Sequence, residues 1–364
     1  MIFYSTTSPG FEDVAAEELK ELGCKIKEER RGKGRVFFEA KIEDIPKLNC
    51  FSRCSERIVL LLGRFKVERL EDVYRAVKQI DFSFIKPEQS FAIRSNRVGE
   101  HDFTSIDIAR EAGQAVIDRY KEDFGVRLRV NLDEPDVIIR CDLVDDDFVV
   151  GVDTTGDEAL HKRNYRIYQH PAPLNPTIAS SLIRLSGWSH EYSLLDPMCG
   201  SGTILIEAGL MARNIPTCKF RKDFAFKKLF QFPEIEWEER VVELELYGVE
   251  KFRKHVEGAR KIAKYVGIPI KFIQGDARKL DEYFERVDYI ITNPPYGLRI
   301  ARKGIIEDLY SKFFESASKI LEKRLVMITA EKKIAREYAT RFFEIKEERS
   351  VMYGGLNCSV FVLE

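Results

Sequence analysis

Hydrophobic and polar positions along the first 60 residues predict one small α+β unit. Alternating apolar residues predict a strand at 2–6, and a helix is expected to open at Ser8-Pro9-Gly10 and to close at Gly23. A hairpin is expected at 25–40, with its turn at Gly32-Lys33-Gly34. The apolar spacing that follows predicts a further helix from Ile42 through Ile58 to Leu62.

The pattern restarts at Leu70 and predicts a second α+β unit. Helices are expected at 70–80 and from a Thr104 cap to Tyr120, with a strand at 90–94 between them. After Gly125 the period changes to two, which predicts three strands at 126–130, 136–143 and 148–152. The residues spaced for a single buried face of the longer helix are Ile106, Ala109, Ala112 and Val116.

A segment rich in proline, basic and aromatic residues, 156–175, separates these units from a different pattern. Beyond it, β-like runs alternate with helical ones, which is typical of a doubly wound, mainly parallel sheet. The chain ends in a predicted antiparallel hairpin over 344–363. The expected fold class is α/β, with domains at 1–60, 61–155 and 176–364 and a linker at 156–175. The strands expected before the hairpin are 192–195, 244–249, 271–274, 288–292 and 324–329, with a helix at 204–211.

Charge is distributed unevenly along the 364 residues. The net charge of −1 divides into 0 over residues 1–60, −8 over 61–160 and +7 over 161–364. An acidic middle segment argues against general electrostatic binding of nucleic acid there, because phosphate contacts need Lys and Arg. We expect the phosphate contacts from Lys162, Arg163 and Arg166 and from the run Lys219 to Lys228.

The seven cysteines form no CxxC pair and no ligand cluster with the five histidines. This spacing predicts neither a metal site nor a disulfide framework. No apolar run approaches the ~20 residues of a membrane span, and the first residues are unlike an export signal. We therefore expect a cytoplasmic protein with no membrane association.

The first strand after the linker ends in a glycine loop, Asp196-Pro197-Met198-Cys199-Gly200-Ser201-Gly202-Thr203. Its two glycines let the backbone turn sharply and approach a ligand closely. Leu205 stands where a dinucleotide loop has its third glycine, which disfavours NAD, and Asp196 suits a ligand with an ammonium group. The next two strands lead to Glu250, suited to the hydroxyls of a ribose, and Asp276, suited to the amino group of adenine.

The fourth strand ends in Thr292-Asn293-Pro294-Pro295-Tyr296-Gly297, the most specific motif in the chain. An exocyclic amine of a base is a poor nucleophile because its lone pair is delocalised into the ring. The Asn293 side-chain oxygen and the Pro294 carbonyl are each expected to accept one N–H bond from this amine, which aims its lone pair at a methyl donor. Tyr296 offers a face on which an unstacked base can rest. Cys199 lies too far along the sheet edge from Asn293 to act as a pyrimidine nucleophile.

These motifs resemble the class I S-adenosylmethionine-dependent methyltransferases over about 165–364, and Asn293-Pro294-Pro295-Tyr296 resembles their amino-methylating members. Lys162-Arg163-Asn164-Tyr165-Arg166 and His170-Pro171-Ala172-Pro173-Leu174, taken with that loop, resemble the THUMP-domain-containing RNA guanine-N2 methyltransferases of the archaeal and bacterial tRNA branch. The resemblance implies a Rossmann-like catalytic domain preceded by ferredoxin-like and THUMP domains.

The resemblance also implies a function, namely methyl transfer from S-adenosyl-L-methionine to N2 of a guanosine in the acceptor stem of tRNA. It places Asn293, Pro294 and Tyr296 at the acceptor amine, and Thr177 over the methionine end of the cofactor. The other cofactor-binding residues that it implies are Asp196, Cys199, Gly200, Ser201, Gly202, Thr203, Glu250, Asp276, Ala277 and Asn293.

Two other functions stay open on the sequence. An adenine-N6 methyltransferase of DNA or RNA uses the same four-residue loop, although the N-terminal half is unlike a DNA-recognition region. The second is a non-catalytic RNA-binding protein with a decayed methyltransferase fold. The intact acidic residues at 196, 250 and 276, together with Asn293, disfavour it, because decay would not spare this set. The insertion at 213–239 either guides RNA or packs on the sheet, and the oligomeric state is open, with a monomer compatible. A fragment beginning near Tyr165 is expected to bind cofactor without methylating tRNA.

Overall fold

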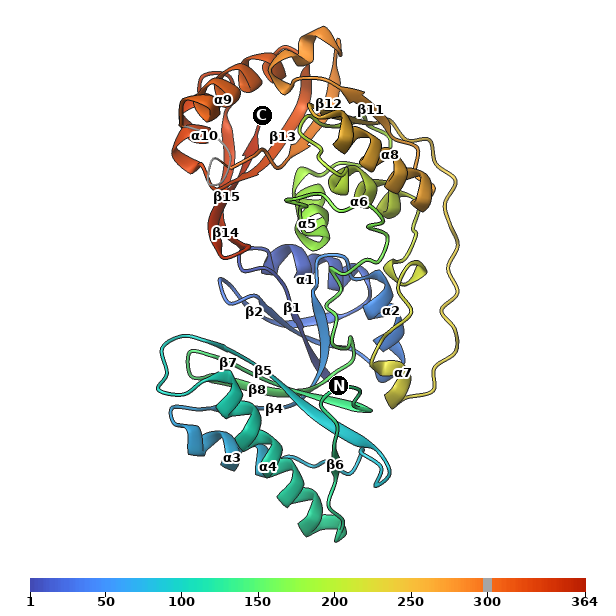
Figure 1. Ribbon diagram of the computed structural model, residues 1–364, viewed down its shortest axis with the longest axis vertical. Coiled ribbons are helices and arrows are strands. Elements are labelled where there is room, and N and C mark those ends of the chain that lie inside the picture. Colours follow the sequence, from blue (N-terminus) through green and yellow to red (C-terminus); the bar gives the residue numbers. More distant parts are fainter. Residues whose placement is uncertain (297–302) are drawn as a thin grey trace.

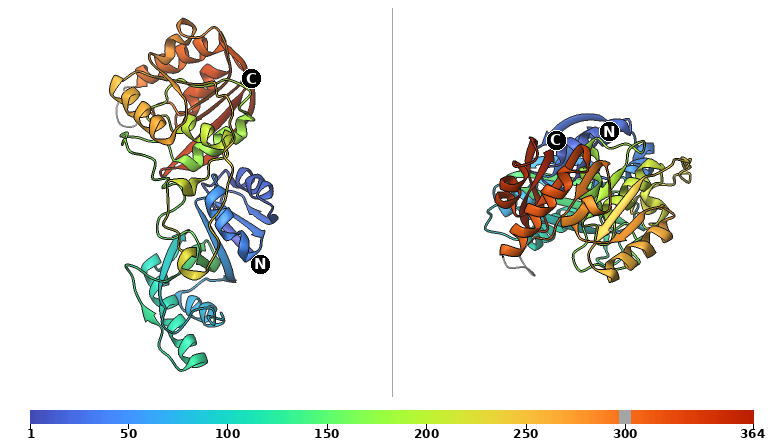
Figure 2. Two further views of the ribbon diagram at one scale, coloured as in Figure 1. Left: turned by 90° about the vertical axis from the view of Figure 1, so that its right-hand side faces the viewer. Right: turned by 90° about the horizontal axis from the view of Figure 1, so that it is seen from above.

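The structure is a computed structural model that describes residues 1–296 and 303–364. Its strands form two sheets, an eight-stranded one in the N-terminal half and a seven-stranded one in the C-terminal half. Figures 1 and 2 show the two sheets one after the other along the long axis of the molecule, with the residues at the very N-terminus between the two ends.

The first unit follows the sequence prediction up to its second helix. Ile58, Val59 and Leu60 lie in a strand where a helix running to Leu62 was predicted, so that prediction is wrong beyond residue 51. The apolar run is compatible with either structure by itself, and pairing on both edges, with β1 and β8, makes it a central strand. The elements are β1 (Ile2–Thr6), α1 (Glu12–Glu21), β2 (Lys25–Arg30), β3 (Arg35–Glu39), η1 (Ile42–Asp44), α2 (Ile45–Phe51) and β4 (Arg57–Lys66).

The second unit confirms the predicted order of elements. Thr104 caps α4, because its hydroxyl accepts a hydrogen bond from the Asp107 N–H at 3.3 Å. The buried face predicted for α4 is wrong at its first residue, because Ile106 is 76% exposed and Ile108 is buried instead. The elements are α3 (Leu70–Lys78), β5 (Ser90–Val98), α4 (Ser105–Phe124), β6 (Arg129–Val130), β7 (Val137–Val144) and β8 (Asp147–Asp153).

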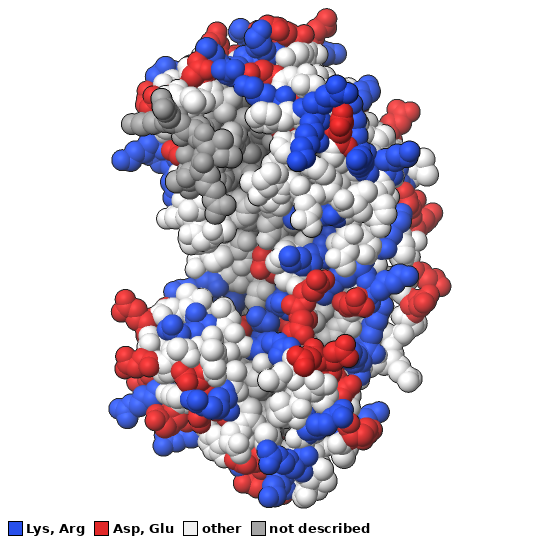
Figure 3. All heavy atoms as spheres, viewed as in Figure 1, with Lys and Arg blue, Asp and Glu red and all other residues white. Residues whose placement is uncertain are grey.

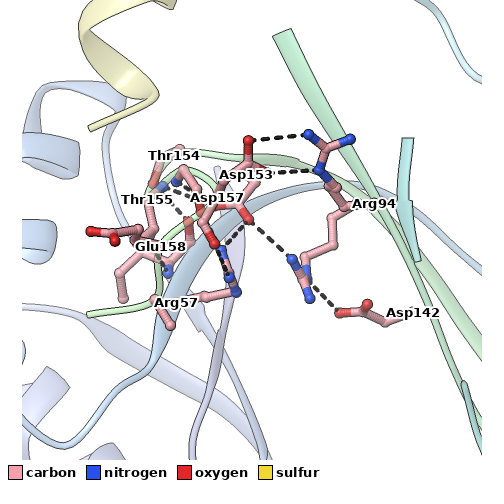
Figure 4. A network of polar contacts seen from close by, with 12 residues as sticks. Arg57, Arg94, Asp142, Asp153, Thr154, Thr155, Asp157 and Glu158 are labelled. Atoms are coloured by element: carbon pink, nitrogen blue, oxygen red, sulfur yellow. Dashed lines mark hydrogen bonds and ion pairs between the residues drawn. The ribbon is translucent and has the colours of Figure 1, made fainter. Parts of the chain in front are cut away.

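The two N-terminal units share one sheet, with the strand order β2-β3-β1-β4-β8-β7-β5-β6. β4 runs through the domain boundary predicted at residue 60 and pairs with both units. At its start, Arg57 donates to the buried carboxylate of Asp153 at 2.9 Å, and Arg140 donates to the same oxygen at 3.2 Å. Arg94 pairs with Asp157 at 2.6 Å, so the beginning of the 156–175 segment is fixed to the sheet (Figure 4).

The C-terminal half is the predicted α/β domain. Its strand order is β11-β10-β9-β12-β13-β15-β14, parallel up to β13, and β15 is antiparallel to both of its neighbours. Among the described residues, no helix has both the length and the apolar character needed to cross a membrane. The elements are α5 (Pro176–Ser186), β9 (Leu194–Asp196), α6 (Thr203–Ala212), η2 (Thr217–Lys219), α7 (Phe226–Leu229), β10 (Leu246–Glu250), α8 (Arg253–Val266), β11 (Lys271–Gln274), η3 (Ala277–Glu282), β12 (Val287–Thr292), α9 (Lys303–Ser318), β13 (Leu321–Thr329), α10 (Lys332–Ala339), β14 (Ile345–Tyr353) and β15 (Leu356–Leu363).

The segment between α6 and β10, residues 213–245, contains the insertion predicted at 213–239 and forms a strap from the C-terminal domain to the N-terminal sheet. Figure 1 shows α7, in the middle of the strap, beside the N-terminal half. The N–H of Phe226 donates to the Thr154 carbonyl at 3.0 Å. The buried guanidinium of Arg221 donates to the carbonyls of Ala159, Thr155 and Glu158 at 2.8, 3.1 and 2.6 Å. Arg221 is therefore a structural residue, and its predicted contact with RNA phosphates is wrong.

A buried ionic cluster joins the two halves around Glu207 of α6. Its carboxylate accepts from Arg163 at 3.2 Å and from the Tyr165 hydroxyl at 2.7 Å, and Arg53 pairs with it at 3.5 Å. Burial alone raises the pKa of Glu207, but the two guanidiniums bring it below its ordinary value. Arg163 is only 2% exposed, so the phosphate contact predicted for it is also wrong.

Candidate active site

The carboxyl ends of four parallel strands bring the predicted site residues to one edge of the sheet. Asp196 ends β9 and lies opposite Gly248 of β10, two residues before Glu250. Glu250 lies opposite Gln274 of β11, so Asp276 follows at the same edge. Asn293 leaves β12, the other neighbour of β9, from this edge as well. Open α/β sheets bind ligands at this position.

Asp196 is buried, with 3% of its surface exposed. Its Oδ1 accepts the Met198 N–H at 3.2 Å and the Thr292 hydroxyl at 3.0 Å. Burial raises the pKa of this carboxyl to about 7, although both hydrogen bonds act to lower it. The Thr292 bond also ties the end of β9 to the strand that carries Asn293.

Glu250 is the second buried carboxylate of the site and is 8% exposed. Its Oε2 accepts the Gly200 N–H at 3.1 Å, and its Oε1 accepts the Phe252 N–H at 2.9 Å. In the part of the chain that the structure describes, no Lys or Arg forms an ion pair with Asp196 or Glu250. Two buried carboxylates with no cation fit a ligand that has both positive charge and hydroxyl donors, as S-adenosylmethionine has.

The glycine loop takes the backbone shape that the sequence predicts. Gly200 and Gly202 have φ values of +52° and +78°, in the region that favours glycine. A Cβ on Gly200 would lie 3.3 Å from the ring of His170, and a Cβ on Gly202 would lie 3.1 Å from that of Phe272. The other predicted loop residues, Cys199, Ser201 and Thr203, are buried. Burial raises the pKa of the Cys199 thiol well above its ordinary value, so this thiol is protonated.

Asp276 is held by a residue that the sequence did not single out. Arg278 donates to both of its carboxylate oxygens, from Nε at 2.9 Å and from Nη2 at 2.6 Å, and holds the pKa of the carboxyl well below its ordinary value. Arg278 also donates to Asp308 of α9 at 2.7 Å. No sequence signal joins these residues, because Asp308 lies 30 positions away. Ala277 follows as a buried residue, and the adenine contact of Asp276 stays a prediction.

The loop that follows β12, Asn293 to Tyr296, holds the Asn293 side chain through its own tyrosine. The Tyr296 hydroxyl donates to Asn293 Oδ1 at 2.5 Å. Burial raises the pKa of Tyr296, so the phenol keeps the proton that it donates. Pro294 is buried and Pro295 is exposed. The predicted stacking role of Tyr296 stays a prediction, and Gly297, the last residue of the motif, lies outside the described residues.

The segment before α5 contributes to the same edge. Thr177 is buried in the first turn of α5 and donates its hydroxyl to the Asn175 side chain at 2.9 Å. Its contact with the methionine end of the cofactor stays a prediction. The His170 ring, which lies against Gly200, is 4.2 Å from the ring of His255 in α8. The sequence motif contains His170 but predicts no role for it, because nothing in the motif indicates a contact with a residue of α8.

Comparison with protein families gives three matches along the chain. Residues 3–59 match the RlmL ferredoxin-like domain, residues 67–153 match the THUMP domain, and residues 163–359 match the RMKL-like methyltransferase domain. These matches confirm the resemblance and the fold class predicted from the motifs. The domain limits at 60, 155 and 175 remain predictions.

Two relatives are similar over nearly the whole chain. A protein of Archaeoglobus fulgidus is 53% identical over 365 residues, which cover 99% of this chain and 91% of the relative. A protein of Methanocaldococcus jannaschii is 48% identical over 379 residues, which cover 100% of both chains. Both relatives are named tRNA (guanine(6)-N2)-methyltransferase.

One solved structure adds a bound molecule to the comparison. The structure of SMU.472 in complex with SAH is similar with a TM-score of 0.82 at 25% identity, covering 99% of this chain and 97% of that one. The methyltransferase family model matches more than half of the chain, and the relatives match it from end to end. The chain therefore belongs to the RMKL-like methyltransferase family, with ferredoxin-like and THUMP domains ahead of the catalytic domain.

Proposed function

We propose that this protein is an S-adenosylmethionine-dependent tRNA methyltransferase that forms N2-methylguanosine at position 6, in the acceptor stem. The observation that carries the proposal is the position of Asn293 at the same sheet edge as Asp196 and Glu250, two buried carboxylates without a cation among the described residues. The names of the two relatives support tRNA and its guanosine 6 as the substrate. The SAH complex of SMU.472 supports the cofactor.

The cofactor side of the site lies along β9, β10 and η3. Bound cofactor supplies a methyl group on a positively charged sulfur. Asp196 compensates positive charge on the cofactor, and Glu250 accepts the ribose hydroxyls. Asp276 receives the adenine amino group, and Thr177 covers the methionine end. The backbone at Gly200 and Gly202 and the residues Cys199, Ser201, Thr203 and Ala277 complete the surface that the cofactor contacts.

The acceptor side of the site lies in the loop after β12. Asn293 Oδ1 and the Pro294 carbonyl each accept one N–H of the guanosine amine, which fixes the direction of the nitrogen lone pair. Tyr296 holds the Asn293 oxygen in place through its 2.5 Å hydrogen bond. With cofactor bound, the nitrogen would form its bond to the methyl carbon as the bond between that carbon and the sulfur breaks, leaving neutral S-adenosylhomocysteine, and the nitrogen would release one proton to solvent. Catalysis then comes from positioning rather than from a strong base.

The N-terminal units are assigned the task of placing the RNA. Extruding a nucleotide from a duplex costs a few kcal/mol, and contacts elsewhere along the RNA offset that cost. The THUMP match at residues 67–153 supports this role. The proposal includes a cytoplasmic location, where tRNA is found.

The test uses the full chain, labelled S-adenosylmethionine and two unmodified tRNA transcripts. One transcript carries guanosine at position 6, and the other carries adenosine there with a compensating change in the paired nucleotide. Mass spectrometry of the nucleosides is expected to find N2-methylguanosine in the first transcript and no methylation in the second. N6-methyladenosine in the second transcript would favour the adenine methyltransferase instead, and methylation of neither would leave an RNA-binding protein.

A further inference from the structure

One short segment of the chain carries a strong local excess of positive charge. Residues 251–271 contain seven Lys and Arg and one Glu, a net charge of +6 in a chain of net charge −1. The rest of the chain therefore carries −7, and net charge alone does not attract the protein to a polyanion. Any electrostatic attraction of RNA depends on local surfaces such as this one.

Most of this segment is α8, whose two sides differ sharply. Val256, Ala259 and Ile262 are buried, and they share a core with Ile204 and Leu205 of α6. On the opposite side, Lys254, Lys261 and Lys264 are exposed and follow a spacing of seven and three residues. This spacing places the three ammonium groups on one face of the helix. We call these three lysines the basic face of α8.

The basic face lacks the acidic partners that neutralise other cations of the protein. Among the described residues, Lys254, Lys261 and Lys264 have no ion-pair or hydrogen-bond partner, and the single acid of the helix, Glu257, pairs with Arg253 at 2.8 Å. In the N-terminal sheet, by contrast, Arg57, Arg64 and Arg140 are bound to carboxylates. Within the described residues, no ion pair or hydrogen bond therefore uses these three charges to hold the fold together.

The position of α8 brings the start of the basic face close to the edge of the sheet that carries the site. The helix begins three residues after Glu250, at the edge that carries the site, and its 14 residues extend about 20 Å from there. It covers the same side of the sheet as α5 and α6, and α5 packs on α1 of the N-terminal unit. Figure 3 shows Lys and Arg gathered over the region of α8. RNA bound at Asn293 would lie at the edge of the sheet where α8 begins.

We infer that the basic face of α8 is a docking surface for the sugar–phosphate backbone of the substrate RNA. Phosphates of a duplex supply the closely spaced negative charge that three exposed ammonium groups complement. Two exposed aromatic side chains, Phe252 at 61% and Tyr265 at 52%, lie at the two ends of the helix, where unpaired nucleotides can stack. This inference rests on the proposed function and adds the surface of the catalytic domain that holds the RNA.

The test compares four full-length proteins, of which the fourth, K254R/K261R/K264R, keeps the three charges. The first is wild type, the second is K254Q/K261Q/K264Q, and the third is the matched control K319Q/K323Q/K333Q, which loses the same charge from exposed lysines in and beside β13 and α10. Fluorescence anisotropy measures binding of an unmodified tRNA over a salt series, and calorimetry measures cofactor affinity. Each lost phosphate contact lowers the slope of log affinity against log salt by about 0.7–0.9.

The α8 variant is expected to bind tRNA more than tenfold more weakly at low salt, with a slope lowered by about 2–3, and to keep wild-type cofactor affinity. The control variant is expected to bind like wild type, and K254R/K261R/K264R is expected to retain binding because it keeps the charges. If K254Q/K261Q/K264Q binds tRNA with the affinity and the salt slope of wild type, the inference is overturned. Failure of the wild type itself to bind tRNA would count against the proposed function instead, and wild-type binding to anionic vesicles but not to tRNA would assign the face to a membrane.

Discussion

At the scale of single residues, Asp196 links the chemistry of the site to pH. Burial raises the pKa of its carboxyl to about 7, so the neutral form is favoured below that pH in the protein without cofactor. Its contribution to stability is fully present below the ordinary carboxyl pKa of about 4 and is lost as the pH rises through about 7. A cationic ligand reverses this preference, because it binds the ionised carboxylate.

We therefore predict that cofactor affinity rises with pH up to about 7, by up to about tenfold per pH unit, and then levels off. Calorimetry in buffers of different ionisation enthalpy should detect the release of one proton on binding below that pH. The Asp196→Asn variant should bind more weakly and without this pH dependence. An unchanged pH dependence in the variant would remove Asp196 from contact with the cofactor charge.

The second prediction at this scale concerns Asn293 and Tyr296. Asn293→Ala should lower the rate of methyl transfer by a factor on the order of one hundred or more, since its oxygen acts on the amine in the transition state. Tyr296→Phe keeps the ring and removes only the 2.5 Å bond to Asn293, so we expect a smaller loss of about tenfold.

Single-turnover rates and cofactor titrations separate the effects of these two variants. Both should bind cofactor nearly like wild type, because Asn293 acts mainly on the acceptor amine and no cofactor contact is assigned to Tyr296. A Tyr296→Phe variant with the wild-type rate would show that Asn293 needs no help from the hydroxyl. A Tyr296→Phe variant as slow as Asn293→Ala would show that Tyr296 contributes more to methyl transfer than the orientation of Asn293 predicts.

At the scale of elements, prediction from the sequence succeeded where the local pattern of residues determines the structure. It failed where the partners of a residue or strand are distant in the sequence. Asp196, Glu250, Asp276 and Asn293 were predicted from strand ends, because a parallel sheet brings those ends to one edge. Residues 57–62 were misassigned because an apolar run does not reveal that β1 and β8 pair with it on both sides. Arg278 was missed for the same reason, since its link to Asp308 of α9 appears only after folding.

The strap shows how an element without periodic pattern is held in place. Arg221 is buried and donates to three carbonyls of the segment that follows β8, with no carboxylate among these partners. We predict that Arg221→Ala lowers the free energy of unfolding by on the order of 3 kcal/mol, because buried carbonyls lose their donors. Urea unfolding measures this change.

The exposed neighbour Lys222 is the control, and Lys222→Ala should change the free energy of unfolding by less than about 0.5 kcal/mol. Equal stability of both variants would contradict the structural role of Arg221.

At the scale of the whole molecule, the halves are joined more closely than their sequence patterns suggest. Glu207 of the catalytic domain is buried against Arg53 and Arg163, which both lie before the predicted catalytic domain. Arg349 of β14 pairs with Asp13 of α1 at 2.8 Å. One continuous hydrophobic core includes Phe3 near the N-terminus and Val362 near the C-terminus. These contacts make the N-terminal half part of the support of the catalytic domain.

The last prediction concerns the catalytic half in isolation. The sequence predicts that a fragment starting near Tyr165 keeps cofactor binding and loses only the placement of tRNA, but the structure changes this expectation. The truncation removes α1 from α5, the partners of the strap, and both arginines from Glu207, and it exposes the apolar surface that the halves share. We expect the fragment to aggregate or to unfold at a much lower temperature than the full chain, and to bind cofactor weakly.

Thermal unfolding and calorimetry of the fragment beside the full chain provide the measurement. The full chain should unfold in one transition, because breaking the core between the halves destabilises both of them. The Arg53→Met variant of the full chain is the matched comparison, since it keeps the shared apolar contacts and removes one of the two guanidiniums that compensate Glu207. It should lower the unfolding temperature less than the truncation does and leave cofactor affinity close to wild type. A fragment that melts like the full chain and binds cofactor equally well would mean that the interface contributes to placing RNA alone, as the sequence predicts.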